Sequence, residues 1–152
     1  DAEGRLILAD ALTRASEDAP TLLLNFATLT GAARTALGPD LPPFYTNDDA
    51  LAADLSAASI ETADPIWRMP LWSPYDSDMD TPIADLKNGG DGAFAGSIYA
   101  ALFLKRFINA PSWAHFDVFA WAPKDRPSRP AGGEAQALRA CWRVIRQRFE
   151  KT

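Results

Sequence analysis

The sequence contains one cysteine, one histidine and no apolar run that approaches the roughly 20 residues needed to span a membrane. With Cys141 alone, no disulfide can form within the chain, which fits the reducing cytoplasm, where we expect the protein to act. The N-terminus is acidic where a secretory signal peptide would be basic, so we expect no such signal. An initiator Met is also missing, and we interpret the chain as part of a longer protein.

Basic residues are too few to balance the acidic ones. The chain has 15 Lys and Arg against 20 Asp and Glu, which gives a formal net charge of −5. Nucleic acid and anionic membranes both require a concentrated basic surface, so we expect neither as a partner. Four arginines near the C-terminus recur at helical spacing, and we interpret them as the solvated face of a helix: Arg139, Arg143, Arg146 and Arg148.

The lone histidine, His115, lies in the apolar segment WAHFDVFAW. No cysteine or second histidine repeats near it at ligand spacing, so we interpret it as a packed, hydrogen-bonded strand residue rather than a metal ligand. Asp117 is polar within the same apolar strand, and we expect it to accept hydrogen bonds from local donors. The chain contains neither a phosphate-binding glycine loop of the Walker type nor a serine nucleophile elbow.

The length of the chain suits one compact domain in which helices and strands alternate. Strands are expected at 21–28, 44–46, 83–87 and 113–121, and helices at 3–19, 30–37, about 48–62, 97–108 and 134–149. Asn47 or Asp48 is expected to cap the helix at about 48–62. Between them we expect an ordered proline-rich loop at 64–81, a glycine-rich turn at 88–96 and a further loop at 124–133. This alternation is typical of an α/β fold, and we predict a three-layer α/β/α architecture with a mostly parallel central sheet.

Two carboxylates stand two positions apart at the start of the chain, in the string DAEGRL. Asp1 and Glu3 would enter the first turn of a helix together, and carboxylates this close suit a shared cation. The spacing alone is common, however, and acidic residues also stabilise the positive end of a helix dipole. The residues by themselves therefore leave two interpretations open: a metal site, or an ordinary acidic helix start.

The string ATLTG, at 27–31, closes the first predicted strand. A strand that ends in such a turn offers backbone groups at the carboxyl edge of a sheet, where ligands of α/β proteins bind. The same string is also compatible with a plain connection between a strand and a helix. Its residues alone do not choose between these two interpretations.

Several strings in their order resemble the leucyl (cytosol) aminopeptidase family. They are DAEGRL, ATLTG, FYTNDD, WRMPLW, ADLKNGG, and AGSIYAALFLKRF leading into WAHFDVFAW. The resemblance runs from Asp1 to about Pro123. From Lys124 onward the chain departs from the commoner family pattern of a Gly-Thr-rich loop and a short apolar tail, and we interpret this part as a subfamily variant.

The resemblance implies a site with two divalent metal ions, zinc or manganese, and a bicarbonate ion. Asp1 would ligate one metal through its carboxylate and its carbonyl, and Glu3 would bridge both metals. Arg5 would hold the bicarbonate that acts as general base, and Gly4 would let the backbone approach it closely.

The resemblance also assigns substrate contacts to the ATLTG string. The carbonyls of Thr28 and Leu29 would receive the substrate, and the amide of Gly31 would donate to it. The Leu29 amide would help to hold the bicarbonate. All of these assignments are carried over from the family to the matching positions of this sequence.

The function that the resemblance implies is metal-dependent removal of N-terminal amino acids from peptides that have a free N-terminus, by a hexameric protein. Residues 1–152 would form the C-terminal part of the catalytic domain, while two lysines and two further aspartates would come from an upstream part. We therefore expect the chain alone to bind metal weakly and to be inactive, and either to self-associate or to remain bound to the upstream segment as a nicked enzyme. The alternatives are a non-catalytic scaffold or assembly module of the same fold and, with little support from the acidic charge, a nucleic-acid-binding role.

Overall fold

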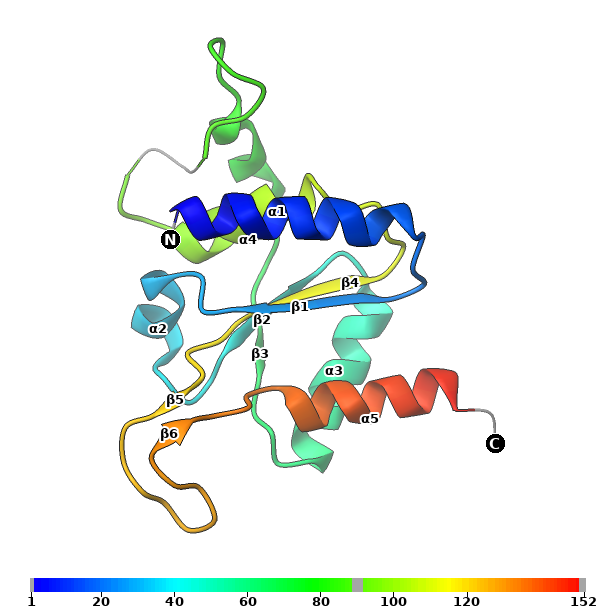
Figure 1. Cartoon of the computed structure of the whole chain (residues 1–152), viewed down its shortest axis with the longest axis vertical. Coiled ribbons are helices and arrows are strands. Elements are labelled where there is room, and N and C mark those ends of the chain that lie inside the picture. Colours follow the sequence, from blue (N-terminus) through cyan, green and yellow to red (C-terminus); the bar gives the residue numbers. More distant parts are fainter. Residues whose placement is uncertain (1, 89–91, 151–152) are drawn as a thin grey trace.

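A four-stranded sheet forms the centre of the computed structural model, which describes residues 2–88 and 92–150 (Figure 1). The strand order is β1-β4-β2-β3. β1 runs parallel to β4 and β2 runs parallel to β3, while β2 and β4 are antiparallel. The strands are β1 (Leu23–Ala27), β2 (Pro43–Thr46), β3 (Trp67–Arg68) and β4 (Trp113–Asp117). The prediction of a mostly parallel sheet is therefore confirmed.

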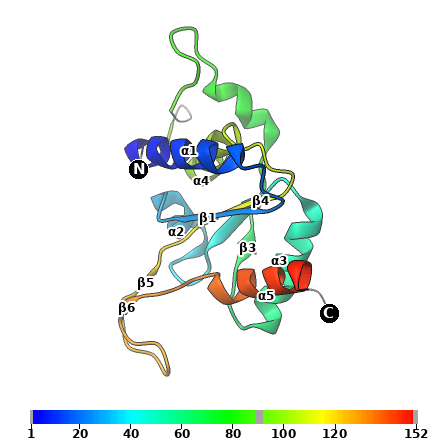
Figure 2. The ribbon, with the colours of Figure 1, turned by 45° about the vertical axis from the view of Figure 1, so that its right-hand side comes forward.

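Helices cover both faces of the sheet, which confirms the predicted α/β/α layers (Figures 1 and 2). On one face lie α1 (Ala2–Glu17) and α4 (Gly96–Lys105), which contact each other. On the other face α3 (Asp49–Glu61) packs against α5 (Leu138–Phe149). The short α2 (Gly31–Leu37) follows β1 directly, and a small hairpin of β5 (Trp121–Ala122) and β6 (Gly132–Gly133) follows β4.

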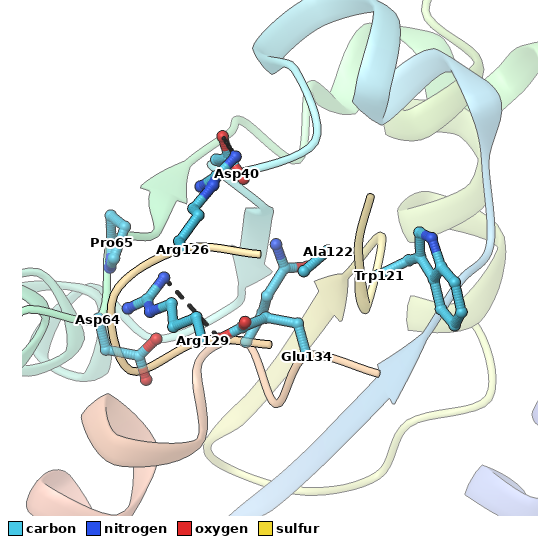
Figure 3. A pocket seen from close by; sticks show the side chains of 9 residues that line it. Asp40, Asp64, Pro65, Trp121, Ala122, Arg126, Arg129 and Glu134 are labelled. Carbon is cyan, nitrogen blue, oxygen red and sulfur yellow. Dashed lines mark hydrogen bonds and ion pairs between the residues drawn. The ribbon is translucent and has the colours of Figure 1, made fainter. Parts of the chain in front are cut away.

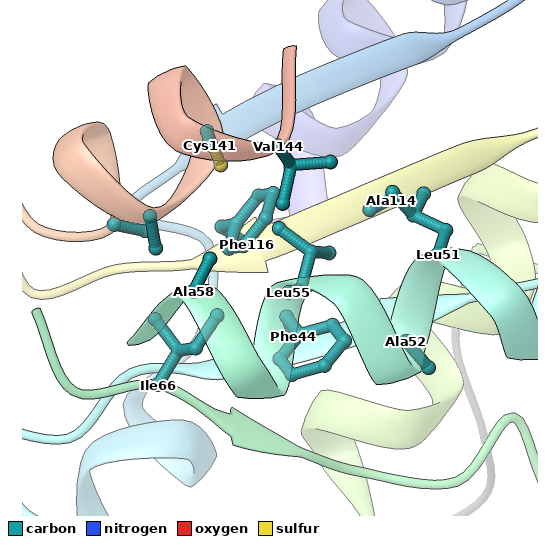
Figure 4. Packing of buried hydrophobic residues seen from close by; sticks show 12 residues of the cluster. Phe44, Leu51, Ala52, Leu55, Ala58, Ile66, Ala114, Phe116, Cys141 and Val144 are labelled. Atoms are coloured by element: carbon teal, nitrogen blue, oxygen red, sulfur yellow. The ribbon is translucent and has the colours of Figure 1, made fainter. Parts of the chain in front are cut away.

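β4 is the strand on which both core clusters are built. All five of its residues are buried, as expected for a strand covered by helices on both faces. Toward α3 and α5, the ring of Phe116 stacks on Phe26 and Phe44, with ring centres 4.7 Å and 5.9 Å away. Figure 4 shows this cluster, in which Leu55 and Val144 reach the sheet from the two helices. The second cluster fills the space between the sheet and the α1–α4 layer.

A series of buried side-chain hydrogen bonds connects β1 and β4. Trp113 Nε1 donates to Asn25 Oδ1 at 2.8 Å, and Asn25 Nδ2 lies 2.8 Å from His115 Nδ1. Because this amide nitrogen can only donate, His115 Nδ1 accepts and the proton of the neutral ring sits on Nε2. Full burial lowers the pKa of His115 to about 3. The interpretation of His115 as a packed strand residue is confirmed.

Two side chains fix where helices begin. Asp48 accepts from the amides of Ala50 and Leu51 at the start of α3, as the sequence predicted for position 47 or 48. At the start of α5, the buried carboxylate of Asp64 accepts from three main-chain amides, those of Ala137, Arg139 and Ala140. The last helix consequently begins at Leu138 rather than at 134.

Other differences from the prediction lie in loops. The expected strand at 83–87 is wrong: these residues form turns and bends, and Ile83 is 92% exposed because no strand lies beside it. The strand expected at 113–121 ends at Asp117, and Ala120 has a φ of 56°, which an extended strand does not allow. The proline-rich loop contains β3 and the 3₁₀ helix η1 (Ser73–Met79). The glycine-rich turn lies partly outside the described residues.

Among the helices formed by residues 2–88 and 92–150, none has the length and apolar character needed to cross a membrane.

The buried, neutral His115 predicts a defined loss of stability in mild acid. Below pH 6.5 the unfolded chain binds a proton at this imidazole that the folded chain refuses down to about pH 3, so folding weakens as pH falls through that window. One such group contributes a slope of up to roughly 1.4 kcal/mol per pH unit. His115→Gln should remove this slope between pH 6.5 and 5.5, in denaturant unfolding of the full-length protein. An unchanged slope relative to wild type would contradict the assignment.

Candidate functional site

The candidate site lies where β1 and β4 end side by side. The register pairs Ala27 with Asp117, the last residues of the two strands, and the amide of Val118 donates to the Ala27 carbonyl at 2.9 Å. The ATLTG string turns away from β1 at this point and leads into α2. The carboxyl edge of two parallel strands is the usual ligand position in α/β proteins.

Asp117 holds the turn that follows β1. Its Oδ1 accepts from the amides of Leu29 and Thr30, both at 3.1 Å. Its Oδ2 accepts from the hydroxyls of Thr30 at 2.6 Å and Ser97 at 3.2 Å, and Ser97 in turn accepts from Tyr45 at 2.6 Å. The expectation that Asp117 satisfies local donors is confirmed. Burial raises the pKa of Asp117, and the hydrogen bonds from Thr30, Ser97 and Leu29 oppose that rise.

One assignment from the resemblance differs from this geometry. The Leu29 amide was expected to help hold bicarbonate, but in the structure it donates to Asp117. The physical reason is that a buried carboxylate needs several donors, and this amide is one of the nearest. The role of Leu29 toward bicarbonate stays a prediction.

Arg5 brings a buried positive charge to the same region from α1. Its residue is 8% exposed, Nη1 donates to the Asn88 carbonyl at 3.0 Å, and the guanidinium carbon lies 5.7 Å from the centre of the Phe103 ring. Burial lowers the pKa of Arg5 while the charge of Asp117 raises it, and an arginine stays protonated in either case. Among the described residues, Nε of Arg5 is buried without a hydrogen-bond partner. A buried cation with an unused donor suits an anionic ligand.

Of the two predicted metal ligands, the structure describes only one. Asp1 lies outside the described residues. Glu3 is exposed in the first turn of α1, two positions before Arg5. Within residues 2–88 and 92–150, no cluster of three or more His, Cys, Asp or Glu side chains could hold a metal ion. The described residues therefore do not form a metal site by themselves.

The predicted substrate contacts line one groove. This groove has a volume of about 420 Å³, and it is lined by Thr28, Leu29, Thr30, Gly31, Arg34, Val118 and Phe119. Thr28, Leu29 and Gly31 thus all line this groove, and their roles as substrate contacts stay predictions. Sequence reasoning did not single out Arg34 or Phe119 as site residues. The only signal in the sequence is that Arg34 follows Gly31 by three positions, about one helical turn.

A second, much smaller pocket of about 10 Å³ lies beneath the β5–β6 hairpin (Figure 3). Ion pairs border it: Arg126 lies 2.9 Å from Asp40, and Arg129 lies 3.8 Å from Glu134. A space of this size holds no more than a water molecule. We therefore interpret this pocket as a small gap where the C-terminal segment packs against the rest of the domain, and not as a ligand site.

Comparison with known proteins places these features in a family. The profile of the cytosol aminopeptidase family, catalytic domain, matches residues 1–142. A probable cytosol aminopeptidase of Chlamydia abortus is 50% identical over 135 residues, 86% of this chain and 27% of that protein. One of Prochlorococcus marinus is 44% identical over 151 residues, 97% of this chain and 31% of that protein.

Solved structures agree with the sequence relatives. A crystal structure of cytosol aminopeptidase from Coxiella burnetii superposes with a TM-score of 0.92 at 51% identity, over 99% of this chain and 33% of that one. The bottromycin maturation enzyme BotP in complex with Mn superposes with a TM-score of 0.87 at 35% identity, over 97% of this chain and 34% of that one. The chain thus spans between a quarter and a third of these relatives' length.

The four hydrogen bonds that the Asp117 carboxylate accepts form a clamp on the turn after β1 and the start of α4, and removing this side chain should cause a large loss of stability. Asp117→Ala leaves two main-chain amides and two hydroxyls without their acceptor, and we expect the free energy of unfolding to fall by about 2–4 kcal/mol. Asp117→Asn keeps one acceptor oxygen and should lose less. Denaturant unfolding of the full-length protein measures both, with the exposed Asp10→Ala on α1 as control. Equal, small effects of Asp117→Ala and Asp10→Ala would refute the clamp.

Proposed function

We propose, since this chain belongs to the cytosol aminopeptidase family, that it is part of a metal-dependent aminopeptidase that releases N-terminal residues from peptides. One observation carries the proposal: the buried guanidinium of Arg5, with an unused donor, lies near the turn that Asp117 holds. Most buried side-chain donors have a partner, so an unused donor on a buried cation is a feature that a bound anion would account for. The arrangement therefore supports an anion-binding role at this edge of the sheet.

The metal site of this proposal is shared with residues beyond the described ones. Asp1 would ligate one ion and Glu3 would bridge two, with further ligands from an upstream part of a longer protein. Carboxylate ligands suit manganese and zinc, and the relative BotP is described in complex with Mn. When bound, a pair of such ions activates a water molecule and polarises the scissile carbonyl.

The remaining residues bind and orient. Arg5 would hold a bicarbonate ion beside the reacting water, with its buried charge undiluted by solvent. The carbonyls of Thr28 and Leu29 would receive the substrate, and the Gly31 amide would donate to it. Because Asp117 fixes the Leu29 and Thr30 amides, the direction of the neighbouring carbonyls is set before the substrate arrives.

The partners of this proposal are peptides with a free N-terminus, and further copies of the protein, as a hexamer, in the cytoplasm. Apolar side chains that remain exposed support association: Ile7 on α1 is 71% exposed, and Trp142 on α5 is 55% exposed. β1 also stands at an edge of the sheet, with pairing groups directed away from β4.

A second candidate function is a non-catalytic scaffold or assembly module of the same fold. The absence of a complete metal-binding cluster in residues 2–88 and 92–150 favours it for the chain taken alone. Activity of the full-length protein decides between the two. Hydrolysis of a leucyl amide supports the aminopeptidase, and a purified, metal-supplied protein without activity supports the scaffold.

Glu3 and Arg5 should differ in their effect on turnover. Glu3→Gln removes the charge proposed to bridge the metals, so kcat should fall by at least about 100-fold while KM changes little. Arg5→Ala should lower kcat less, by roughly tenfold, since hydroxide or bulk bicarbonate substitutes in part. Steady-state hydrolysis of leucine p-nitroanilide by the full-length protein measures both values.

A matched control for these variants is Asp10→Asn, which neutralises an exposed carboxylate on the same helix. It should retain wild-type kcat. Near-normal turnover of Glu3→Gln would overturn the proposed bridging role, and an Arg5→Ala loss larger than that of Glu3→Gln would overturn the proposed order.

A further inference from the structure

Nearly every arginine of this chain is neutralised by a carboxylate. The sequence has eleven arginines, and nine of them form an ion pair with Asp or Glu. Within the described part of the chain, the two that form none are Arg5 and Arg34. This is unexpected for a chain with a net charge of −5, in which acidic partners are in excess. Both unpaired arginines flank the candidate site.

Arg34 lies in the groove that adjoins the ATLTG turn. Among the described residues that line this groove of about 420 Å³, it is the only charged one. Its Nη2 lies 3.8 Å from the position that a Cβ on Gly31 would occupy, so the guanidinium reaches back over the start of α2. A substrate held by the Gly31 amide would thus have the charge of Arg34 beside it.

Phe119 orients this guanidinium. The guanidinium carbon of Arg34 lies 4.7 Å from the centre of the Phe119 ring, which is the geometry of a cation–π contact. The contact holds the guanidinium carbon over the ring, and because an aromatic ring face is not a conventional hydrogen-bond acceptor, the N–H groups of Arg34 are not used up by it. Those donors match the two oxygens of a carboxylate in a bidentate arrangement. The ring also supplies an apolar wall for the methylene groups of a ligand.

We propose that Arg34 and Phe119 make this groove a subsite for a carboxylate carried by the peptide substrate, so that the protein favours peptides with an acidic group near the scissile bond. The inference rests on the proposed aminopeptidase function and names its substrate class. The carboxylate comes from the side chain of an N-terminal Asp or Glu, or from the free C-terminus of a dipeptide, and the experiment separates these sources.

The test compares substrates that differ only in charge, on the full-length protein. The first pair is glutamyl and glutaminyl aminomethylcoumarin, and the second is Leu-Gly and Leu-glycinamide. For Arg34→Gln, the kcat/KM ratio of the acidic over the neutral member should fall about tenfold, as expected for loss of a charge-assisted hydrogen bond at a partly exposed site. Arg34→Lys should restore part of the ratio because it keeps the charge without the planar fork.

The matched control is Arg14→Gln, which removes one exposed, ion-paired arginine on α1 and lowers the net charge equally. It should leave both ratios at their wild-type values. A fall in the glutamyl ratio assigns the carboxylate to the side chain, and a fall only in the Leu-Gly ratio assigns it to the C-terminus. Unchanged ratios for both pairs in Arg34→Gln overturn the inference, as does an equal fall in Arg14→Gln. Absence of hydrolysis of every substrate by the wild-type protein overturns instead the proposed function.

Discussion

The buried carboxylate of Asp117 is the interaction on which the organisation of this edge of the sheet depends. It ends the central strand β4 and binds the turn after β1 through two amides and a hydroxyl. The same group reaches α4 through Ser97 and, through that hydroxyl, β2 through Tyr45. One hydrogen-bond network therefore connects β4, the turn after β1, α4 and β2, and it tolerates little displacement because each lost bond leaves a desolvated polar group. The shape of the groove therefore depends on this network, because residues of the turn line it.

Most arginines of the molecule are likewise paired with an acceptor, in this case a carboxylate that forms an ion pair with them. Surface arginines find carboxylates, and each such exposed pair contributes little to stability. Arg5 and Arg34 form no such pair with any residue that the structure describes, so an ion pair does not account for their positions. Arg5 is buried at a cost in desolvation, with a donor unused, and Arg34 is held over Phe119 beside the ATLTG turn. Arg5 and Arg34 thus bring two positive charges to the edge where the Asp117 carboxylate is already engaged in hydrogen bonds, which is the basis of the proposed binding of anionic groups there.

Much of this arrangement could be predicted from the sequence because the signals were local. Periodicity and caps predicted the helices, and a lone Asp in an apolar strand predicted the Asp117 network. Resemblance assigned substrate contacts to Thr28, Leu29 and Gly31, which line the groove, and these roles, like those of Asp1 and Glu3, stay predictions. Arg34 could not be found in this way, since it differs from the other arginines only in lacking a partner. Which arginines lack an ion-pair partner is decided only by the tertiary structure, which determines the carboxylates that lie close to each arginine. The strand expected at 83–87 failed for a related reason: an apolar pair becomes a strand only where another strand lies beside it.

The side chain of Gln136 connects the C-terminal segment to the groove. Gln136 Oε1 accepts from the amides of Phe119 and Ala120, both at 3.0 Å, and its Nε2 donates to the Pro39 carbonyl at 2.7 Å. These bonds hold the chain where Ala120 takes a positive φ, a conformation that costs energy for a residue other than glycine. They thereby fix the position of Phe119, and with it the ring on which Arg34 rests. Gln136, which belongs to the C-terminal segment, thus helps to set the wall of the groove that Phe119 forms.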